Sequence, residues 1–358
     1  MNTAFIYSDR FADFSYGADH PMRPMRLGLT RELIEEKGLL DLPGAELVEA
    51  RKATEEEVLL AHTPEYIAAL KKADSGEVPP DGGRYGLGFG DNPSFPGVYE
   101  WSCYSAGASV QAAEFVAGGK VRTAFNIAGG LHHAMAERAA GFCYINDPVV
   151  AIKYLAGLGK RVAYVDIDAH HGDGAEAAFY DTDRVLTVSL HESGEFLFPG
   201  TGSSKDIGTG KGKGYSVNLP FPPGTGDDLF VRGFNAVVPS FMEAFAPDVL
   251  VTQLGVDTFA SDPITHLQLT TNGFEEMVRG FRALGLPWVA LGGGGYEMDN
   301  VKRAWTLAWA VMNHAEGMEG LASIRDKPAP DTSGEDDRKA VQTGIDYLLK
   351  EVLPLIGS

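Results

Sequence analysis

Two pairs of adjacent histidines stand out among the nine histidines of this sequence, because each follows a segment typical of a β-strand. The first pair, His132–His133, comes after the turn Gly129–Gly130. The second pair lies in Asp166-Ile-Asp-Ala-His-His-Gly-Asp173, at the end of an apolar, β-branched run. Imidazole and carboxylate groups gathered at strand ends are typical of metal sites and of acid–base catalysis. The two segments are therefore candidates for a reactive site.

Asp166, Asp168 and His170 are expected to project to one side if strand geometry continues through the second segment. Three ionisable groups there are costly to desolvate, and a bound cation would offset that cost. Their donor atoms suit Zn²⁺, and also Fe²⁺ or Mn²⁺. A further ligand is expected from another strand end, where Asp257 follows the run Val249–Leu254. The Asp-x-Asp-x-His pattern alone fits helix capping equally well, but together with Asp257 and the histidine pair it favours a metal site.

A run of four glycines, Gly292–Gly295, follows another expected strand and ends at Tyr296. Glycines allow the backbone to approach a ligand closely. A phosphate-binding loop is the competing interpretation, but the run lacks GxGxxG spacing, and neither it nor Gly208–Gly214 ends in Gly-Lys-Ser/Thr. The tyrosine hydroxyl is better suited to stabilising an oxyanion. Taken alone, a tyrosine after a glycine turn is more often structural.

Short β-branched runs alternate with stretches of helical periodicity along most of the chain. The expected strands are Ala4–Tyr7, Leu47–Ala50, Ala124–Ile127, Arg161–Ile167, Val185–Leu190, Tyr215–Leu219, Val249–Leu254 and Trp288–Leu291. The expected helices include Val98–Val116, Pro148–Leu158, Asp228–Phe245, Gly273–Leu284 and Val301–His314. This alternation predicts an α/β fold, a parallel sheet with helices on both faces. Ligand sites in such sheets form beyond the carboxyl ends of the strands.

The composition indicates a globular protein with a large core, since 44% of the 358 residues are hydrophobic. A formal charge of −19 argues against nucleic-acid binding and favours a cationic substrate. The two cysteines, Cys103 and Cys143, do not suggest a disulfide framework. Neither a signal peptide nor an apolar stretch of about 18 residues is recognisable. We therefore expect a cytoplasmic protein that does not bind membranes.

The domain organisation is expected to be simple. One domain is predicted over residues 1–358, with a catalytic core over residues 4–314 and a C-terminal linker and helix over residues 326–354. The linker is the polar segment Asp326–Asp337. Two glycine-containing segments, Ser75–Pro96 and Glu192–Gly214, are predicted to be long loops. Loops of this length inside a domain are usually functional.

Five segments resemble, in order along the chain, the motifs of the class I histone deacetylases. They are Gly129-Gly-Leu-His-His-Ala134, Gly141-Phe-Cys-Tyr-Ile-Asn-Asp147, Asp166-Ile-Asp-Ala-His-His-Gly-Asp-Gly174, Phe198-Pro-Gly-Thr-Gly202 and Gly292-Gly-Gly-Gly-Tyr296. The bacterial deacetylase-like and acetoin-utilisation proteins look most similar. The resemblance implies the arginase–deacetylase α/β fold, with a parallel sheet of about eight strands. It also implies a metal-dependent amidohydrolase that removes acyl groups from the ε-amine of lysine.

The resemblance places the metal ligands at Asp168, His170 and Asp257. It implies one Zn²⁺ ion per chain, with Fe²⁺ as an alternative in the cell. The family also holds a monovalent cation near the metal strand. Asp168, Ser189 and Leu190 match those positions, so a structural K⁺ ion is expected.

The resemblance also assigns the catalytic residues. It makes His133 the general base that activates the attacking water, paired with Asp173. It places His132 beside His133, paired with Asp166. Tyr296 would donate a hydrogen bond to the tetrahedral oxyanion.

Residues that contact the substrate are implied in the same way. Phe142, with Gly141 before it, and Phe198 match the aromatic pair that lines the family's substrate tunnel. Asp91 matches the aspartate at the tunnel rim, which holds substrate backbone amides. Arg26 resembles the arginine that lines an internal product channel.

The expected partner is an acylated lysine in a protein or peptide. The polyamine-deacylating branch usually has Pro-Pro-Gly before its histidine pair, whereas this chain has Ala128-Gly-Gly-Leu131. The alternatives are a deacylase of small acylated amines such as acetylpolyamines, or an acyl-lysine-binding module without turnover. The sequence does not indicate an oligomeric state.

Overall fold

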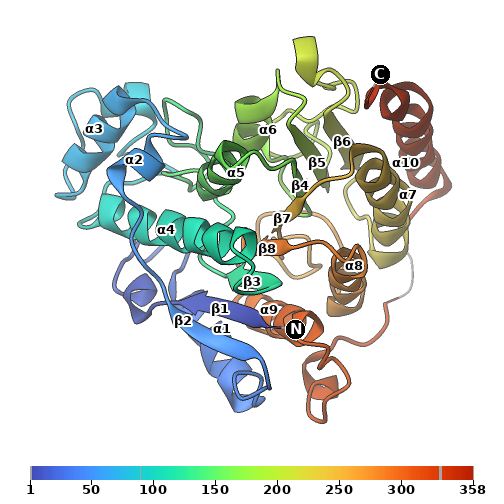
Figure 1. Ribbon diagram of the computed structural model, residues 1–358, viewed down its shortest axis with the longest axis horizontal. Coiled ribbons are helices and arrows are strands. Elements are labelled where there is room, and N and C mark those ends of the chain that lie inside the picture. The colour runs from blue at the N-terminus through green and yellow to red at the C-terminus, as the bar shows by residue number, and fades with distance from the viewer. Residues whose placement is uncertain (1, 89, 330–332, 358) are drawn as a thin grey trace.

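An eight-stranded parallel β-sheet forms the centre of the protein (Figure 1). This computed structural model describes residues 2–88, 90–329 and 333–357. The strand order across the sheet is β2-β1-β3-β8-β7-β4-β5-β6. The strands are β1 Thr3–Tyr7, β2 Ala45–Glu49, β3 Thr123–Asn126, β4 Val162–Asp166, β5 Val185–Glu192, β6 Ser216–Phe221, β7 Val249–Gln253 and β8 Trp288–Leu291.

Helices cover both faces of this sheet. The α4, α5 and α6 helices form one layer, and α1, α9, α8 and α7 form the other, while α10 packs on α7 and the edge strand β6. The helices are α1 Met25–Glu36, α2 Glu55–Val58, α3 Pro64–Ala73, α4 Val98–Ala117, α5 Asp147–Gly157, α6 Asp173–Phe179, α7 Asp227–Phe245, α8 Thr271–Ala283, α9 Met298–Met312 and α10 Glu335–Tyr347. No helix of the described ranges is long and apolar enough to cross a membrane.

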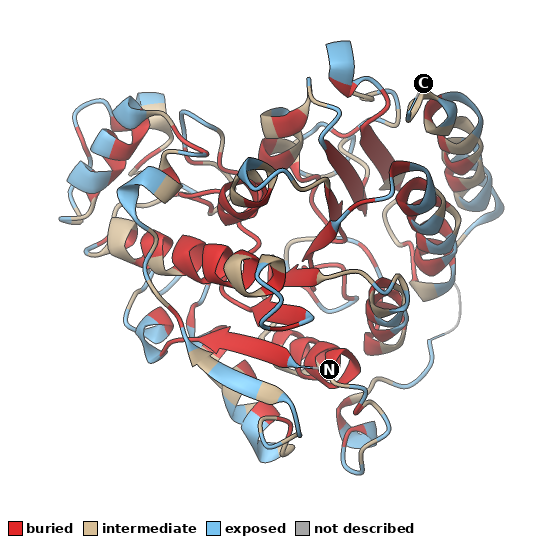
Figure 2. Ribbon diagram, viewed as in Figure 1, coloured by how far each residue is buried: buried red, intermediate tan, exposed pale blue. Residues whose placement is uncertain are grey.

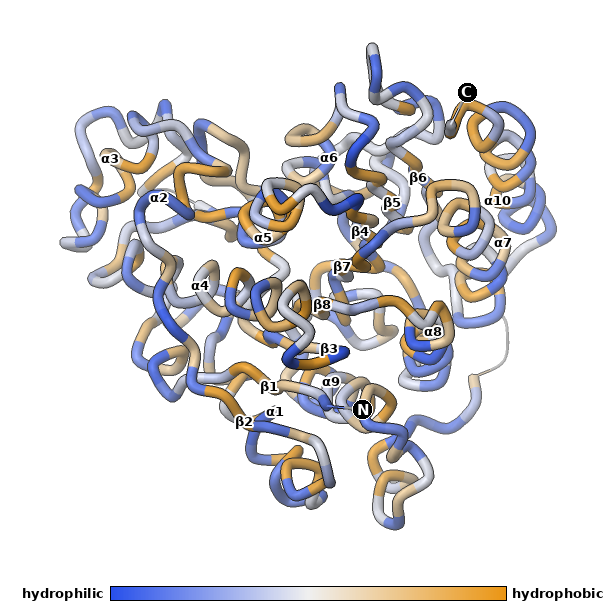
Figure 3. The backbone as a smooth tube through the Cα atoms, viewed as in Figure 1, coloured by the Kyte–Doolittle hydropathy of each residue, from blue (hydrophilic) through white to orange (hydrophobic). Residues whose placement is uncertain are grey.

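The two helical layers explain why the strands read as continuous apolar runs without polar alternation. Every residue of β1, β3, β4, β5, β7 and β8 is buried (Figure 2). The edge strand β2 is largely exposed or half-buried. Hydrophobic segments accordingly concentrate in the central strands and hydrophilic ones lie at the outside (Figure 3).

The fold predicted from the sequence is confirmed, with small shifts at the ends of elements. Strand β4 ends at Asp166 instead of Ile167, and β5 continues to Glu192 instead of ending at Leu190. The α1, α2, α3 and α6 helices were not among the expected elements. Part of the expected linker, residues 330–332, lies outside the described residues.

Candidate active site

Four neighbouring strands at the middle of the sheet carry the polar residues singled out from the sequence. In the order β3, β8, β7, β4, these strands are followed by His132–His133, Tyr296, Asp257 and the segment Asp168–His170. Because all strands are parallel, their carboxyl ends lie at one edge of the sheet. Side chains separated by more than a hundred residues along the chain therefore meet in one place.

Asp168, His170 and Asp257 form a buried triad at this edge. The Nδ1 atom of His170 lies 3.0 Å from Asp168 Oδ1 and 3.0 Å from Asp257 Oδ2. One potential ligand atom from each residue lies within 4.8 Å of the others. All three residues are buried. Two carboxylate oxygens and an imidazole nitrogen in this arrangement are suited to hold a divalent cation.

The remaining carboxylate oxygens of the triad are held by the protein. Asp168 Oδ2 accepts hydrogen bonds from Gln253 Nε2 at 2.6 Å and from the backbone N–H of Gly294 at 2.8 Å. Asp257 Oδ1 accepts one from the Ala169 N–H at 2.9 Å. The opposite oxygen of each carboxylate is thereby directed at His170. The ligand set is oriented by its surroundings, as expected for a metal site.

Glycine is required next to the triad because the backbone approaches the carboxylates closely. A Cβ atom at Gly294 would lie 2.0 Å from Asp257 Oδ2, and one at Gly255 would lie 2.2 Å from Asp168 Oδ2. Both distances are shorter than van der Waals contact. The glycine run after β8 thus allows the backbone to pack closely on the triad, whereas the sequence had suggested a close approach to a ligand.

The charges of the triad favour retention of protons when no cation is bound. Burial opposes a charge on His170, but Asp168 and Asp257 outweigh it and raise the pKa of the imidazole to about 10. Burial and the charge of Asp168 raise the pKa of Asp257 to about 7. A metal ion would have to displace these protons, because a ligand imidazole must be neutral.

The histidine pair lies beside the triad, and each ring is fixed by one carboxylate. His132 Nδ1 lies 2.7 Å from Asp166 Oδ2, and His133 Nδ1 lies 2.7 Å from Asp173 Oδ1. The two Nε2 atoms face each other at 3.1 Å. The pairings implied by the resemblance are therefore present as contacts. Tyr164 also donates a hydrogen bond to Asp166 Oδ2 at 2.7 Å.

The two histidines have opposite proton affinities. Burial opposes a charge on His132, but Asp166 and Asp168 outweigh it and raise its pKa to about 9. Burial and the neighbouring charge of His132 lower the pKa of His133 to about 4, although Asp173 acts in the opposite direction. At neutral pH His133 is thus an unprotonated imidazole whose Nδ1–H is committed to a carboxylate. Its Nε2 atom carries no proton and faces Nε2 of the protonated His132.

Asp147 holds the turn that presents the histidine pair, a role that sequence analysis missed. Its carboxylate accepts hydrogen bonds from the N–H groups of Gly130 at 3.0 Å and Leu131 at 2.8 Å, and from Ser109 Oγ at 2.5 Å. Asn146 donates to the carbonyl of His132 at 2.9 Å. Both side chains lie at the start of α5. Asp147 was visible in the sequence only as the last residue of a motif.

Tyr296 stands at the edge of the site, half-buried. Burial and the carboxylates of Asp257 and Asp168 raise its pKa well above the ordinary value, so its phenol stays protonated and can donate a hydrogen bond. The Tyr296 N–H donates to Asp262 Oδ2 at 2.9 Å. Arg26 is buried behind the glycine run and donates to the carbonyl oxygens of residues 293 and 295, each at 2.8 Å.

Phe142 and Phe198, called here the aromatic rim, each contact a residue of the candidate site. The Phe198 ring meets His133 edge to face at a centroid distance of 5.0 Å, and Phe142 meets Tyr296 in the same way at 5.6 Å. Phe142 has a φ of 68°, which is unusual for a residue with a side chain. A Cβ atom at Gly141 would lie 2.5 Å from the His133 ring.

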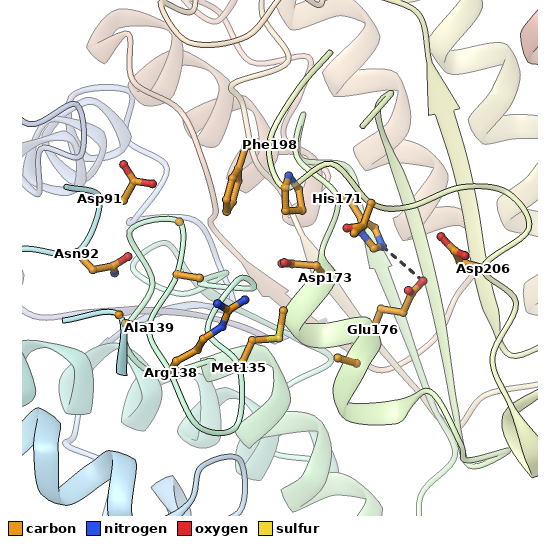
Figure 4. Close-up of a pocket in the computed structure, with 16 residues that line it drawn as sticks. Asp91, Asn92, Met135, Arg138, Ala139, His171, Asp173, Glu176, Phe198 and Asp206 are labelled. Carbon is orange, nitrogen blue, oxygen red and sulfur yellow. Dashed lines mark hydrogen bonds and ion pairs between the residues drawn. The ribbon is translucent and has the colours of Figure 1, made fainter. Parts of the chain in front are cut away.

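A cavity of about 690 Å³ lies beside the aromatic rim (Figure 4). Its lining includes Gly141, Asp173 and Phe198 from the predicted site, but not the triad itself. The exposed Asp91 lies at one end of this cavity, in the view of Figure 4 next to Asn92. Asp91 is therefore placed on the cavity that Phe198 also lines.

Of the three residues predicted to hold a monovalent cation, Asp168 follows β4, and Ser189 and Leu190 lie on the neighbouring strand β5. Ser189 is paired in register with Asp166, and Leu190 is the next residue of β5. The Ser189 hydroxyl lies 2.9 Å from His191 Nδ1. This cation site stays a prediction.

The fold and the site together define a hydrolase of the histone deacetylase family. The sequence model of the Histone deacetylase domain matches residues 20–312, most of the chain. The protein therefore belongs to this family, and the resemblance noted in its sequence motifs is confirmed.

Several relatives and solved structures support the assignment to this family. The acetoin utilization protein AcuC of Bacillus subtilis is 41% identical over 319 residues, covering 87% of this chain and 82% of that protein. Histone deacetylase 1 of Homo sapiens is 41% identical over 310 residues, which cover 86% of this chain and 64% of that protein. The crystal structure of an HDAC homolog from Aquifex aeolicus is similar with a TM-score of 0.87 at 35% identity, over 97% of this chain and 100% of that chain. The structure of an HDAC homolog complexed with SAHA also has a TM-score of 0.87.

Binding of Zn²⁺ to the metal-stripped protein at neutral pH is expected to release at least one proton. His170, with a raised pKa of about 10, is protonated at that pH and must lose its proton to become a ligand. Metal affinity should therefore rise as the pH increases towards 10. Calorimetric titration in buffers of different ionisation enthalpy measures the release. A binding enthalpy independent of the buffer would contradict the expectation.

Asp257→Asn provides the matched test of the ligand set. Loss of one anionic ligand is expected to weaken Zn²⁺ binding by more than about tenfold. Asp183→Asn removes the same charge from an exposed loop residue and serves as the control. Equal affinities of the two variants would remove Asp257 from the metal site.

Proposed function

We propose that this protein hydrolyses the amide bond of Nε-acyl-lysine in peptides and proteins, releasing a carboxylate and the lysine amine. The observation that carries the proposal is the meeting, at one sheet edge, of the Asp168–His170–Asp257 triad, the histidine pair and Tyr296. Membership of the histone deacetylase family supports the reaction class.

Asp168, His170 and Asp257 would hold one divalent cation, which we propose to be Zn²⁺, with Fe²⁺ as the alternative in the cell. The donor set of two carboxylates and one imidazole suits both ions. When bound, the cation would supply positive charge that polarises the amide carbonyl and makes a water molecule more acidic. We also retain a K⁺ ion near Asp168, Ser189 and Leu190 as a structural proposal.

His133 takes the proton from the attacking water in this proposal. Its lowered pKa leaves the Nε2 atom unprotonated at neutral pH, and Asp173 fixes the ring orientation. The proton can then pass to the leaving amine, which would otherwise depart as an unstable anion. His132 remains positively charged beside Asp166 and stabilises negative charge that develops next to it.

Tyr296 stabilises the oxyanion as a neutral hydrogen-bond donor. Its raised pKa keeps the proton on the phenol at neutral pH. The hydrogen bond from its backbone N–H to Asp262 fixes the position of the residue. Donors that are placed before the reaction need no reorganisation when the charge forms.

The space beside the aromatic rim favours a polypeptide substrate over a small amine. The aromatic rim provides two rings for an extended aliphatic lysine stem. The adjoining cavity of about 690 Å³ provides room for the residues on either side of that lysine. Asp91, at the rim, is proposed to accept hydrogen bonds from substrate backbone amides, and Arg26 to line an internal product path.

The proposal is tested by the release of carboxylate from acyl-lysine peptides and acylpolyamines. Protein stripped of metal with a chelator is refilled with Zn²⁺, Fe²⁺ or Mn²⁺ before the assay. We expect metal-restored release from the peptides to exceed release from the polyamines. Release from polyamines alone would favour the small-amine alternative, and tight peptide binding without release would favour a binding module.

Tyr296→Phe is expected to lower kcat by about 10²–10³-fold, the effect of removing one oxyanion donor. Tyr154→Phe, which removes a hydroxyl from the half-buried outer side of α5, is the matched control and should retain its activity. His133→Ala should lose most activity as well. A near-normal rate for Tyr296→Phe would exclude the tyrosine from the mechanism.

A further inference from the structure

The cavity beside the aromatic rim carries charges that the proposed reaction does not use. It extends from the rim past Phe198 to the start of α6 (Figure 4). Arg138 is the one lysine or arginine among the described residues that line it. The carboxylates of four residues line it too, namely Asp91, Asp173, Glu176 and Asp206.

Most of these carboxylates already have partners in the protein. Asp173 accepts a hydrogen bond from the proposed general base. Glu176 accepts one from the Asn218 amide, and Asp206 Oδ2 accepts one from the Ser203 N–H at 2.9 Å. These three carboxylates therefore already accept hydrogen bonds from residues around the cavity.

Arg138, by contrast, takes part in no ion pair within the described part of the chain. Its side chain is exposed, and Figure 4 shows it with Met135 in the space that also holds Asp173. A guanidinium group is always charged and offers parallel N–H donors that match a carboxylate. The group is thus free to bind an anion next to the rim.

The backbone that carries Arg138 is fixed, which distinguishes it from an arginine on a mobile surface loop. Met135 N–H donates to the Arg138 carbonyl at 2.9 Å and closes a tight turn. Thr63 N–H donates to the carbonyl of residue 136 at 2.8 Å, and Ala139 N–H donates to the Tyr85 carbonyl at 2.9 Å. The turn is therefore held to two other segments of the chain. A pre-positioned charge of this kind loses less entropy on binding.

We propose that Arg138 binds a carboxylate of the substrate next to the acyl-lysine whose side chain passes the aromatic rim. This inference rests on the proposed function and adds a substrate preference to it. The whole chain is strongly acidic, with a formal charge of −19, so anions are repelled at long range. One arginine at the rim then selects substrates in which a carboxylate accompanies the lysine. The carboxylate is that of a neighbouring Asp or Glu side chain, or the α-carboxylate of a terminal or free acyl-lysine.

Matched substrates distinguish these two sources. Short acetyl-lysine peptides with blocked ends carry Glu or Gln at each position flanking the lysine, and Nα-blocked acetyl-lysine is used as free acid or as amide. With full-length, Zn²⁺-replete protein at low salt, we expect kcat/KM for one Glu peptide, or for the free acid, to exceed that of its uncharged partner by about tenfold, mainly through KM.

Variants of Arg138 test whether this side chain sets the ratio of kcat/KM between the charged substrate and its uncharged partner. Arg138→Gln should bring the charged-to-uncharged ratio close to one, and Arg138→Glu should invert it. Arg138→Lys keeps the positive charge but loses the two parallel N–H donors of the guanidinium group, and it should give an intermediate ratio. Lys72→Gln, which removes one positive charge from an exposed position on α3, should keep the wild-type ratio.

An unchanged ratio in Arg138→Gln, or no preference for any carboxylate in the wild type, would overturn the inference. Equilibrium binding of the same compounds, measured by calorimetry, reads the preference without turnover. Loss of turnover for every peptide with a preserved binding preference would count against the proposed function and support the role of Arg138. Turnover of the peptides without any carboxylate preference would support the proposed function and count against the role of Arg138.

Discussion

The electrostatic repulsion between buried carboxylates at one sheet edge is the constraint on which the rest of the site depends. Asp168 and Asp257 face the same imidazole nitrogen, and the buried Asp166 lies two residues before Asp168 at the end of β4. Such groups are tolerated in a dry interior only when protons, donors or a cation compensate them. Gln253, the glycine run after β8 and the backbone beyond β4 supply donors. The negative charge that these donors leave uncompensated is directed at His170, and this residual charge suits the triad to hold a cation.

Much of the fold and the ligand set could be predicted from the sequence because both leave local patterns. The eight strands appear as eight short, mostly apolar runs, and ionisable residues directly after such runs are unusual enough to be noticed. The supporting residues leave no such pattern. Asp147, Gln253 and Asp262 are single polar residues, and their roles arise from contacts across 16, 85 and 34 positions of the chain. The α6 helix is only seven residues long and offers little periodicity to detect.

The residues proposed to carry the chemistry and those proposed to set the selectivity lie on different kinds of structure. The triad and the histidine pair lie on rigid strand ends and are held by buried hydrogen bonds. The aromatic rim and Arg138 belong to loops between strands and helices, and Phe198 meets His133 through a ring contact. Substitutions in those loops can change what reaches the site while the reacting groups keep their geometry.

The hydrogen bond from Gly294 to Asp168 joins residues that are 126 positions apart, and it has a consequence for how the protein matures. During synthesis, the segment with Asp168 and His170 leaves the ribosome well before Asp257 and the strand β8. Neither the full ligand set nor its supporting donors exist until the central strands have assembled. A cation held by this triad would therefore bind only late in the life of the nascent chain, and once bound it would lock the completed sheet against reopening.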